Sequence, residues 1–137
     1  MKAPGLPFAL ALLLAGCSTT NSPKGKADPK SLPETVLVTY NVKPGREAEL
    51  EAVLFRVWEI YRRENLVFAQ PHVIVRDASD GKPRITEILT WVNHAAPDQA
   101  PAEVKAAWKE MHALCEARDG RGGLQGGEVE LIVPKAK

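Results

Sequence analysis

Apolar and polar residues alternate in three separate stretches of the chain, and each alternation predicts a β-strand. The first stretch covers residues 35–42, the second residues 72–76 and the third residues 84–92. Alternation of this kind is typical of strands with one face toward a core, and β-branched and aromatic residues favour the same structure. A fourth stretch, EVELIV at residues 128–133, predicts the last strand, and the glycines of residues 120–127 before it predict a flexible linker.

Two further stretches carry apolar residues at helical spacing. In residues 46–65 the apolar side chains recur every three or four positions, which predicts a helix with one apolar stripe. A second helix is predicted to begin at Pro101, because proline suits a first helical turn, and to end at Asp119-Gly120. Its stripe consists of Val104, Ala107, Trp108, Met111, Leu114 and Cys115.

The predicted elements follow the order βαββαβ, which is the ferredoxin-like arrangement. We therefore expect an α+β fold in which two helices cover one face of a four-stranded antiparallel sheet. The other face still carries apolar residues such as Leu37 and Ile88. Because exposed apolar sheet faces need a cover, the sequence predicts a homodimer that forms through this sheet face.

The amino-terminal segment is apolar and uncharged from residue 6 to residue 15. Such a run is too short for a membrane span, which needs about 20 residues, and it predicts a signal peptide over residues 1–16. Leu14-Ala15-Gly16-Cys17 also resembles the lipobox of bacterial lipoproteins. The resemblance implies diacylglyceryl transfer to Cys17, cleavage before it and acylation of the new amino terminus. A plain signal peptide and a buried helix are the alternatives.

The resemblance also implies a place for the domain in the cell. Acyl chains on Cys17 would anchor the chain to a membrane. Ser18 follows, and the absence of an inner-membrane-retaining Asp there favours the outer membrane, facing the periplasm. Residues 17–33 are polar and predict a flexible tether, so we expect the folded domain to cover residues 34–134.

The charge balance and the spacing of the histidines argue against nucleic acid and metal ions as partners. The chain has 18 basic and 17 acidic residues, and loss of Lys2 with the signal peptide leaves 17 of each. This balance gives no reason to expect nucleic acid as a partner. The three histidines lie on different predicted elements without ligand spacing, so no metal site is predicted. No resident cofactor is predicted either.

Three stretches resemble the dimeric α/β-barrel superfamily, in particular proteins of the antibiotic biosynthesis monooxygenase type. They are VTYNVKPGREAELEAVL, ITEILTWV and AAWKEMHALCE, and the likeness covers nearly all of residues 34–133. The resemblance implies a homodimer whose two sheets pack face to face into a barrel. It also implies a pocket in each subunit, between the sheet and the helices.

Five residues are candidates for lining this pocket. They are Tyr40, Glu87, Trp91, Trp108 and His112. Glu87 and Trp91 share a strand face, so Glu87 is either a buried carboxylate, whose pKa burial would raise, or the ion-pair partner of Arg84 or Arg118. Some monooxygenases of this type carry Asn at the position of Glu87, four residues before a strand Trp.

The other candidates also have two interpretations each. Haem-degrading relatives use a helix His as an iron ligand, so His112 could bind a cofactor, or it could be an exposed residue beside the stripe. The aromatic residues could surround an aromatic ligand or form the core. Cys115, on the apolar stripe, is predicted to be a buried packing thiol.

Two functions therefore remain open at the level of sequence. The first is a lipid-anchored lipoprotein whose dimeric barrel domain binds a small apolar or aromatic ligand, or a partner. The alternative is a cofactor-independent monooxygenase-like enzyme that acts on an aromatic or polyphenolic substrate.

Overall fold

The computed structural model describes residues 28–134, so Cys17 and the predicted signal peptide lie outside the described residues. The described elements are η1 (Pro29–Ser31), β1 (Glu34–Asn41), α1 (Glu47–Arg63), β2 (Val67–Asp77), β3 (Arg84–Trp91), α2 (Ala102–Leu114) and β4 (Leu124–Glu128). Their order is the predicted βαββαβ. The division into residues 1–16, 17–33 and 34–134 stays a prediction.

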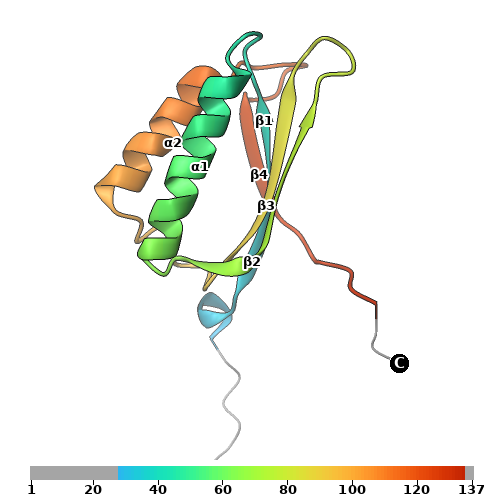
Figure 1. The fold of residues 1–137 in the computed structure, drawn as a ribbon. Coiled ribbons are helices and arrows are strands. Elements are labelled where there is room, and N and C mark those ends of the chain that lie inside the picture. Colours follow the sequence, from blue (N-terminus) through green and yellow to red (C-terminus); the bar gives the residue numbers. More distant parts are fainter. Residues whose placement is uncertain (1–27, 135–137) are drawn as a thin grey trace, which may run out of the picture.

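The strands form one four-stranded sheet in the order β2-β3-β1-β4, and every neighbouring pair is antiparallel. Both helices cover one face of this sheet, and the other face is open (Figure 1). The ferredoxin-like α+β fold is therefore confirmed. In the register of the two central strands, Val38 of β1 lies opposite Glu87 of β3.

Helix α1 packs on the sheet through its predicted stripe. Its buried residues are Leu50, Val53, Leu54, Val57, Ile60 and Tyr61. Acidic residues stand in the first turn and arginines in the last, which matches the helix dipole. The helix ends at Arg63, and Asn65 then adopts a left-handed φ of 54°, which asparagine tolerates better than most residues.

The prediction for the last strand is wrong. Residues 128–133 were expected to form it, but β4 is Leu124–Glu128 and includes glycines assigned to a linker. Backbone pairing with residues 36–40 of β1 stabilises β4, so the strand does not depend on side-chain alternation. Gly123, just before it, is required sterically, because an added Cβ would lie 2.8 Å from the backbone nitrogen of Glu116.

The predicted end of the second helix is also wrong. Helix α2 ends at Leu114 and not at Asp119-Gly120, because the chain turns there to pair with the end of β1. Cys115 forms a β-bridge with Val42, and the backbone N–H of Glu116 donates to the Asn41 carbonyl at 2.8 Å. This pairing brings the start of β4 against β1.

The second strand is longer than predicted. Residues 72–76 form the centre of β2, which extends from Val67 to Asp77 with a register irregularity between Val67 and His72. Beyond the irregularity the pairing with β3 is regular, and His72 lies opposite Leu89. Because Leu89 is buried under the helices, His72 and Ile74 also face the helical layer.

Candidate functional site

A mostly apolar cavity lies between the sheet and α2. Its volume is about 250 Å³, and its lining residues are Val38, Tyr40, Trp91, Trp108, Met111, His112 and Leu124. Alternation along β1 places Val38 and Tyr40 on the helical side of the sheet. Helical spacing places Trp108, Met111 and His112 along one side of α2, so both elements contribute neighbouring side chains to the wall.

The indole of Trp91 is the centre of an aromatic group beside this cavity. Its ring lies edge-on to that of Trp108, with centroids 6.5 Å apart, and to that of Tyr61, with centroids 5.0 Å apart. The Trp108 indole N–H donates to the Tyr61 hydroxyl. These contacts fix the rings, because edge-to-face packing and a buried hydrogen bond both favour one orientation.

Behind the cavity wall lies a buried carboxylate. Glu87 is 1% exposed, and neither predicted arginine pairs with it. Instead the Tyr40 hydroxyl donates to Glu87 Oε2 at 2.9 Å, and His72 Nε2 lies 3.0 Å from Glu87 Oε1. A buried carboxylate needs hydrogen-bonding partners to be tolerated, and these two side chains supply them.

The two predicted arginine partners are used elsewhere. Arg84 lies on the open face of the sheet, 4.0 Å from Asp77. Arg118 bonds Glu116 through Nε at 3.0 Å and donates to the carbonyl of Pro83 at 3.0 Å. Arg118 therefore secures the loop before β4 and does not reach the site.

The two tyrosines keep their protons at neutral pH. Burial is the main cause that raises the pKa of Tyr40 well above its usual value, and the nearby Glu87 carboxylate adds to it. Burial also raises the pKa of Tyr61, although the hydrogen bond from Trp108 partly opposes the shift. Tyr40 is consequently a hydrogen-bond donor to Glu87 and not a phenolate.

Four of the five candidate residues line the same cavity, and the fifth is one hydrogen bond behind it. Tyr40, Trp91 and Trp108 form the walls, whereas His112 is exposed at the edge. Glu87 contributes through Tyr40. The residue that sequence reasoning missed is His72, which was considered only as a metal ligand.

Trp58 packs on His72, the histidine that contacts Glu87. Its ring stacks on His72 with the centroids 3.5 Å apart and the planes 10° from parallel. Trp58 lies on α1, is half-buried, and packs against the core as well as on the histidine. The alternation of side chains along β2 could have indicated His72, since it places residues 72, 74 and 76 on one face of the sheet.

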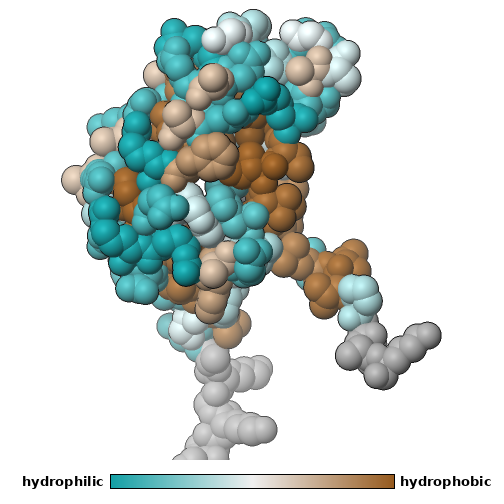
Figure 2. Space-filling view, viewed as in Figure 1, coloured by the Kyte–Doolittle hydropathy of each residue, from teal (hydrophilic) through white to brown (hydrophobic). Residues whose placement is uncertain are grey.

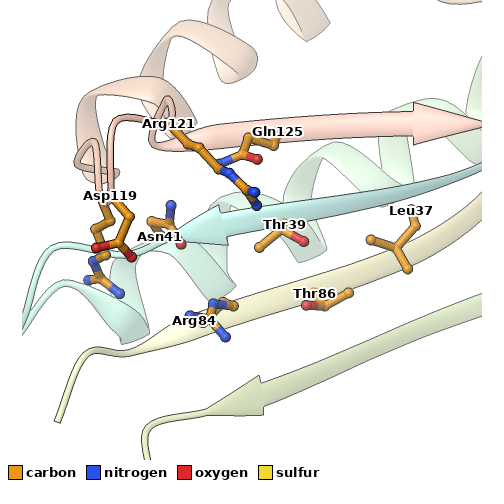
Figure 3. A pocket seen from close by; sticks show the side chains of 9 residues that line it. Leu37, Thr39, Asn41, Arg84, Thr86, Asp119, Arg121 and Gln125 are labelled. Atoms are coloured by element: carbon orange, nitrogen blue, oxygen red, sulfur yellow. The ribbon is translucent and has the colours of Figure 1, made fainter. Parts of the chain in front are cut away.

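A second hollow lies on the open face of the sheet. It has a volume of about 460 Å³, and Leu37, Thr39, Asn41, Arg84, Thr86, Arg118, Asp119, Arg121 and Gln125 line it. Figure 3 shows Thr39 and Asn41 of β1 between Thr86 on β3 and Gln125 on β4. None of the candidate residues lies here, so the sheet separates this polar hollow from the aromatic cavity.

Cys115 is buried, as its place among apolar residues predicts, and it is a free thiol. Burial raises the pKa of this thiol to about 11, although the charges of Arg118 and Lys43 act in the opposite direction. A thiol with so high a pKa is a poor nucleophile at neutral pH. Within residues 28–134, no three His, Cys, Asp or Glu side chains are grouped so that they could hold a metal ion.

No family model matches the chain, and no curated protein is similar to it in sequence. Solved structures are similar. SnoaB of Streptomyces nogalater, described as a cofactor-independent oxygenase, superposes with a TM-score of 0.57 at 17% identity, over 77% of this chain and 98% of its own. The chain has the fold of antibiotic biosynthesis monooxygenases.

Two other structures support this conclusion. Putative antibiotic biosynthesis monooxygenases from Bacteroides thetaiotaomicron and Caulobacter crescentus superpose with TM-scores of 0.55 and 0.56, at 19% and 14% identity. They are covered over 95% and 93% of their own lengths, and this chain over 77% and 76%. Identities this low establish the monooxygenase-like fold, and function must be argued from the site.

Proposed function

We propose that the cavity between the sheet and α2 binds a small aromatic or apolar ligand. The observation that carries this proposal is the composition of the cavity wall, in which Trp91, Trp108 and Tyr40 present ring surfaces beside Met111. Apolar surroundings with a few polar groups are typical of small-molecule sites. The volume of about 250 Å³ lies below the roughly 300–1,000 Å³ usual for drug-sized ligands, so one or two rings suit it.

The ligand-binding proposal can be tested with 1-naphthol as the probe. Isothermal titration calorimetry on the full chain should show binding that Trp108→Ala weakens about tenfold or more, because the ring removed is part of the wall. Lys109→Ala is the matched control on the next residue of α2, which is exposed and does not line the cavity. Equal affinities for the wild type and Trp108→Ala would contradict this site.

A monooxygenase-like reaction is the second candidate function. It is favoured by the fold and by the Tyr40–Glu87 hydrogen bond, which places a protonated phenol at the cavity wall and a buried carboxyl group directly behind it. A polyphenolic substrate would itself supply the electrons that reduce dioxygen, because no resident cofactor is invoked. Oxygen uptake with 1,4-dihydroxynaphthalene, above the rate of its autoxidation, should fall in Glu87→Gln. Uptake at the autoxidation rate in the wild type would leave only the binding function.

The lipid anchor at Cys17 is a further part of the proposal. Its support is the tetrapeptide Leu14-Ala15-Gly16-Cys17, which directly follows an uncharged apolar run. Within residues 28–134, no helix is long and apolar enough to cross a membrane. Labelling of the wild type with an alkyne fatty acid, lost in Cys17→Ser, would support lipidation. Sucrose-gradient fractionation would test whether the labelled protein lies in the outer membrane.

We also propose that a second copy covers the open face of the sheet. The valines of β2 that point to this face are solvent-exposed, Val73 by 46% and Val75 by 54%. Figure 2 shows apolar residues gathered over the sheet side and the carboxyl-terminal segment, where Leu131, Ile132 and Val133 are exposed. Exposed apolar groups of this kind mark interaction surfaces.

Light scattering on the full chain in detergent tests the dimer. The wild type should have the mass of two copies, and Val75→Asp should reduce it toward one copy, because the charge would be buried in the interface. Phe55→Asp is the matched control, since Phe55 is 57% exposed but lies on the helical side. A monomeric wild type would rule out the proposed barrel.

A further inference from the structure

A row of hydrogen bonds runs across three neighbouring strands under the helices. Tyr40 of β1 donates to one oxygen of Glu87 on β3, at 2.9 Å, and the other oxygen lies 3.0 Å from Nε2 of His72 on β2. The three side chains share the helical face of the sheet. Each oxygen of the carboxylate therefore has a different partner, on opposite sides of the strand.

The two ends of this row reach different spaces. Tyr40 lines the aromatic cavity beside α2. His72 lines a separate open cleft of about 400 Å³ on the α1 side, together with Glu51, Phe55, Ile74, Arg76 and Ile85. Glu87 lines neither space and is 1% exposed. The carboxyl group therefore connects the mostly apolar cavity beside α2 with the cleft on the α1 side.

The orientation of His72 is fixed by its neighbours. Trp58 stacks on one ring face, and Glu87 holds Nε2, which leaves Nδ1 as the nitrogen available to the cleft. The side chain of His72 is 13% exposed, so it retains contact with solvent. An imidazole held in this way has one nitrogen toward a buried carboxyl and one toward water, which is the arrangement of a proton shuttle.

We propose that Tyr40, Glu87 and His72 form a proton-transfer path from the aromatic cavity to the cleft beside α1. The path deepens the proposed binding function and rests on it, and it predicts ligands with a phenolic hydroxyl. Tyr40 would touch the ligand directly, Glu87 acts through Tyr40, and His72 acts through Glu87 as a positioning residue.

The transfer conserves protons at every step. The proposed path requires a starting state in which Glu87 carries a proton on Oε1 and His72 carries one on Nδ1 only. A ligand hydroxyl gives its proton to Tyr40 Oη, Tyr40 gives its own to Glu87 Oε2, and Glu87 gives the Oε1 proton to His72 Nε2. His72 then releases the Nδ1 proton to solvent. One O–H bond of the ligand is broken, and one proton reaches the water of the cleft.

The charged groups around His72 are few and can be named. Glu51 of α1 and Arg76 of β2 form an ion pair in the same cleft. Glu87 of β3 is the direct partner, and Tyr40 and Tyr61 are the titratable groups next to Glu87. The Glu51–Arg76 pair carries no net charge, and Glu87 is the ionisable group in direct contact with His72.

Nuclear magnetic resonance on the full chain in detergent tests this coupling without a ligand. The sequence has two tyrosines and three histidines, so ¹³C labels at tyrosine Cζ and histidine Cε1 give few signals. In the wild type the Tyr40 signal should shift over the same pH interval as the His72 signal. The Tyr40 shift should disappear in His72→Gln and in Glu87→Gln, although His72 still titrates in Glu87→Gln.

Two outcomes would overturn the path. One is a wild-type Tyr40 signal that does not follow His72, and the other is a Tyr40 shift that persists in Glu87→Gln. Either result would mean that the three residues form a buried hydrogen-bond network that does not transfer protons. Loss of the native spectrum in a variant would be recognised from the Tyr61 signal, and Tyr40→Phe then provides the second test, because His72 should titrate at a different pH in it.

Binding of 4-nitrophenol extends the test to the ligand. Absorbance of the bound phenolate should change over the pH interval of His72 in the wild type, and His72→Gln should abolish this dependence while binding persists. If calorimetry detects no binding of 4-nitrophenol or of 1-naphthol, the proposed binding function fails. The resonance experiment would still decide whether the three residues exchange protons.

Discussion

Removal of the Glu87 carboxylate should destabilise the protein by far more than a surface change. In Glu87→Leu, the Tyr40 hydroxyl and His72 Nε2 lose the partner that they share at 2.9 and 3.0 Å. Glu87 is 1% exposed, so water cannot replace it easily. Each unsatisfied buried group costs about 1–3 kcal/mol, which gives about 2–6 kcal/mol for the two groups.

A double-mutant cycle separates the Tyr40–Glu87 bond from the other effects of the substitution. Tyr40→Phe alone should cost about 1–3 kcal/mol, because it removes one donor from a buried carboxylate. In the double variant Tyr40→Phe/Glu87→Leu the shared bond is already absent. The combined cost should therefore be about 0.5–3 kcal/mol less than the sum of the single costs.

Urea unfolding followed by tryptophan fluorescence measures these free energies, because the chain has three tryptophans. Arg46→Ala is the control, since its ion pair with Glu49 is exposed and should contribute at most about 1 kcal/mol. If the Tyr40 and Glu87 effects add to within about 0.5 kcal/mol, the two residues do not interact as the structure indicates.

The remaining predictions concern Cys115 and the start of β4. With a pKa of about 11, Cys115 should react with iodoacetamide at pH 8 at least about 100-fold more slowly in the folded than in the unfolded chain, as mass spectrometry can measure. Above pH 9 the unfolded thiol ionises while the folded thiol stays protonated, so the free energy of unfolding should decrease with rising pH. The slope should approach about 1.4 kcal/mol per pH unit, and urea titrations should find it smaller in Cys115→Ala. Gly123→Ala should cost about 1–3 kcal/mol in the same assay, because its Cβ would overlap Glu116. Gly127→Ala is the control for Gly123, since its Cβ would meet nothing within 4 Å.

Most of the fold was predictable because its elements have a strong hydrophobic period. The alternation around Tyr40 and Glu87 and the stripe of α1 each specify one buried face, and the observed elements follow them. The last strand was missed for the opposite reason. In β4 the sequence LQGGE has little side-chain alternation, and its stability comes from backbone pairing with β1, which a local pattern cannot reveal.

The site was predictable in part, because the alternation of side chains along β1 and β3 places Tyr40, Glu87 and Trp91 on the face that the helices cover. The partner of Glu87 was not predicted, because Arg84 and Arg118 were the expected partners, whereas His72 lies on the neighbouring strand. The hairpin turn around Asp80-Gly81 sets the register between β2 and β3, from which the His72–Glu87 contact could have been predicted. Its register pairs Asp77 with Arg84 and Ile74 with Glu87, which brings His72 diagonally beside Glu87 on the same face.

The aromatic cavity and the open face lie on opposite sides of the sheet, so ligand binding and dimerisation should be separable. The aromatic cavity and Glu87 lie under the helices, whereas Val73 and Val75 point from the opposite face of the sheet. A second copy on the open face would therefore cover the polar hollow around Arg84 and leave the cavity accessible. It follows that Val75→Asp should lower the mass in solution without changing the affinity for 1-naphthol, while Trp108→Ala should do the reverse. If either variant lost both dimerisation and 1-naphthol binding, the two surfaces would not be independent of each other.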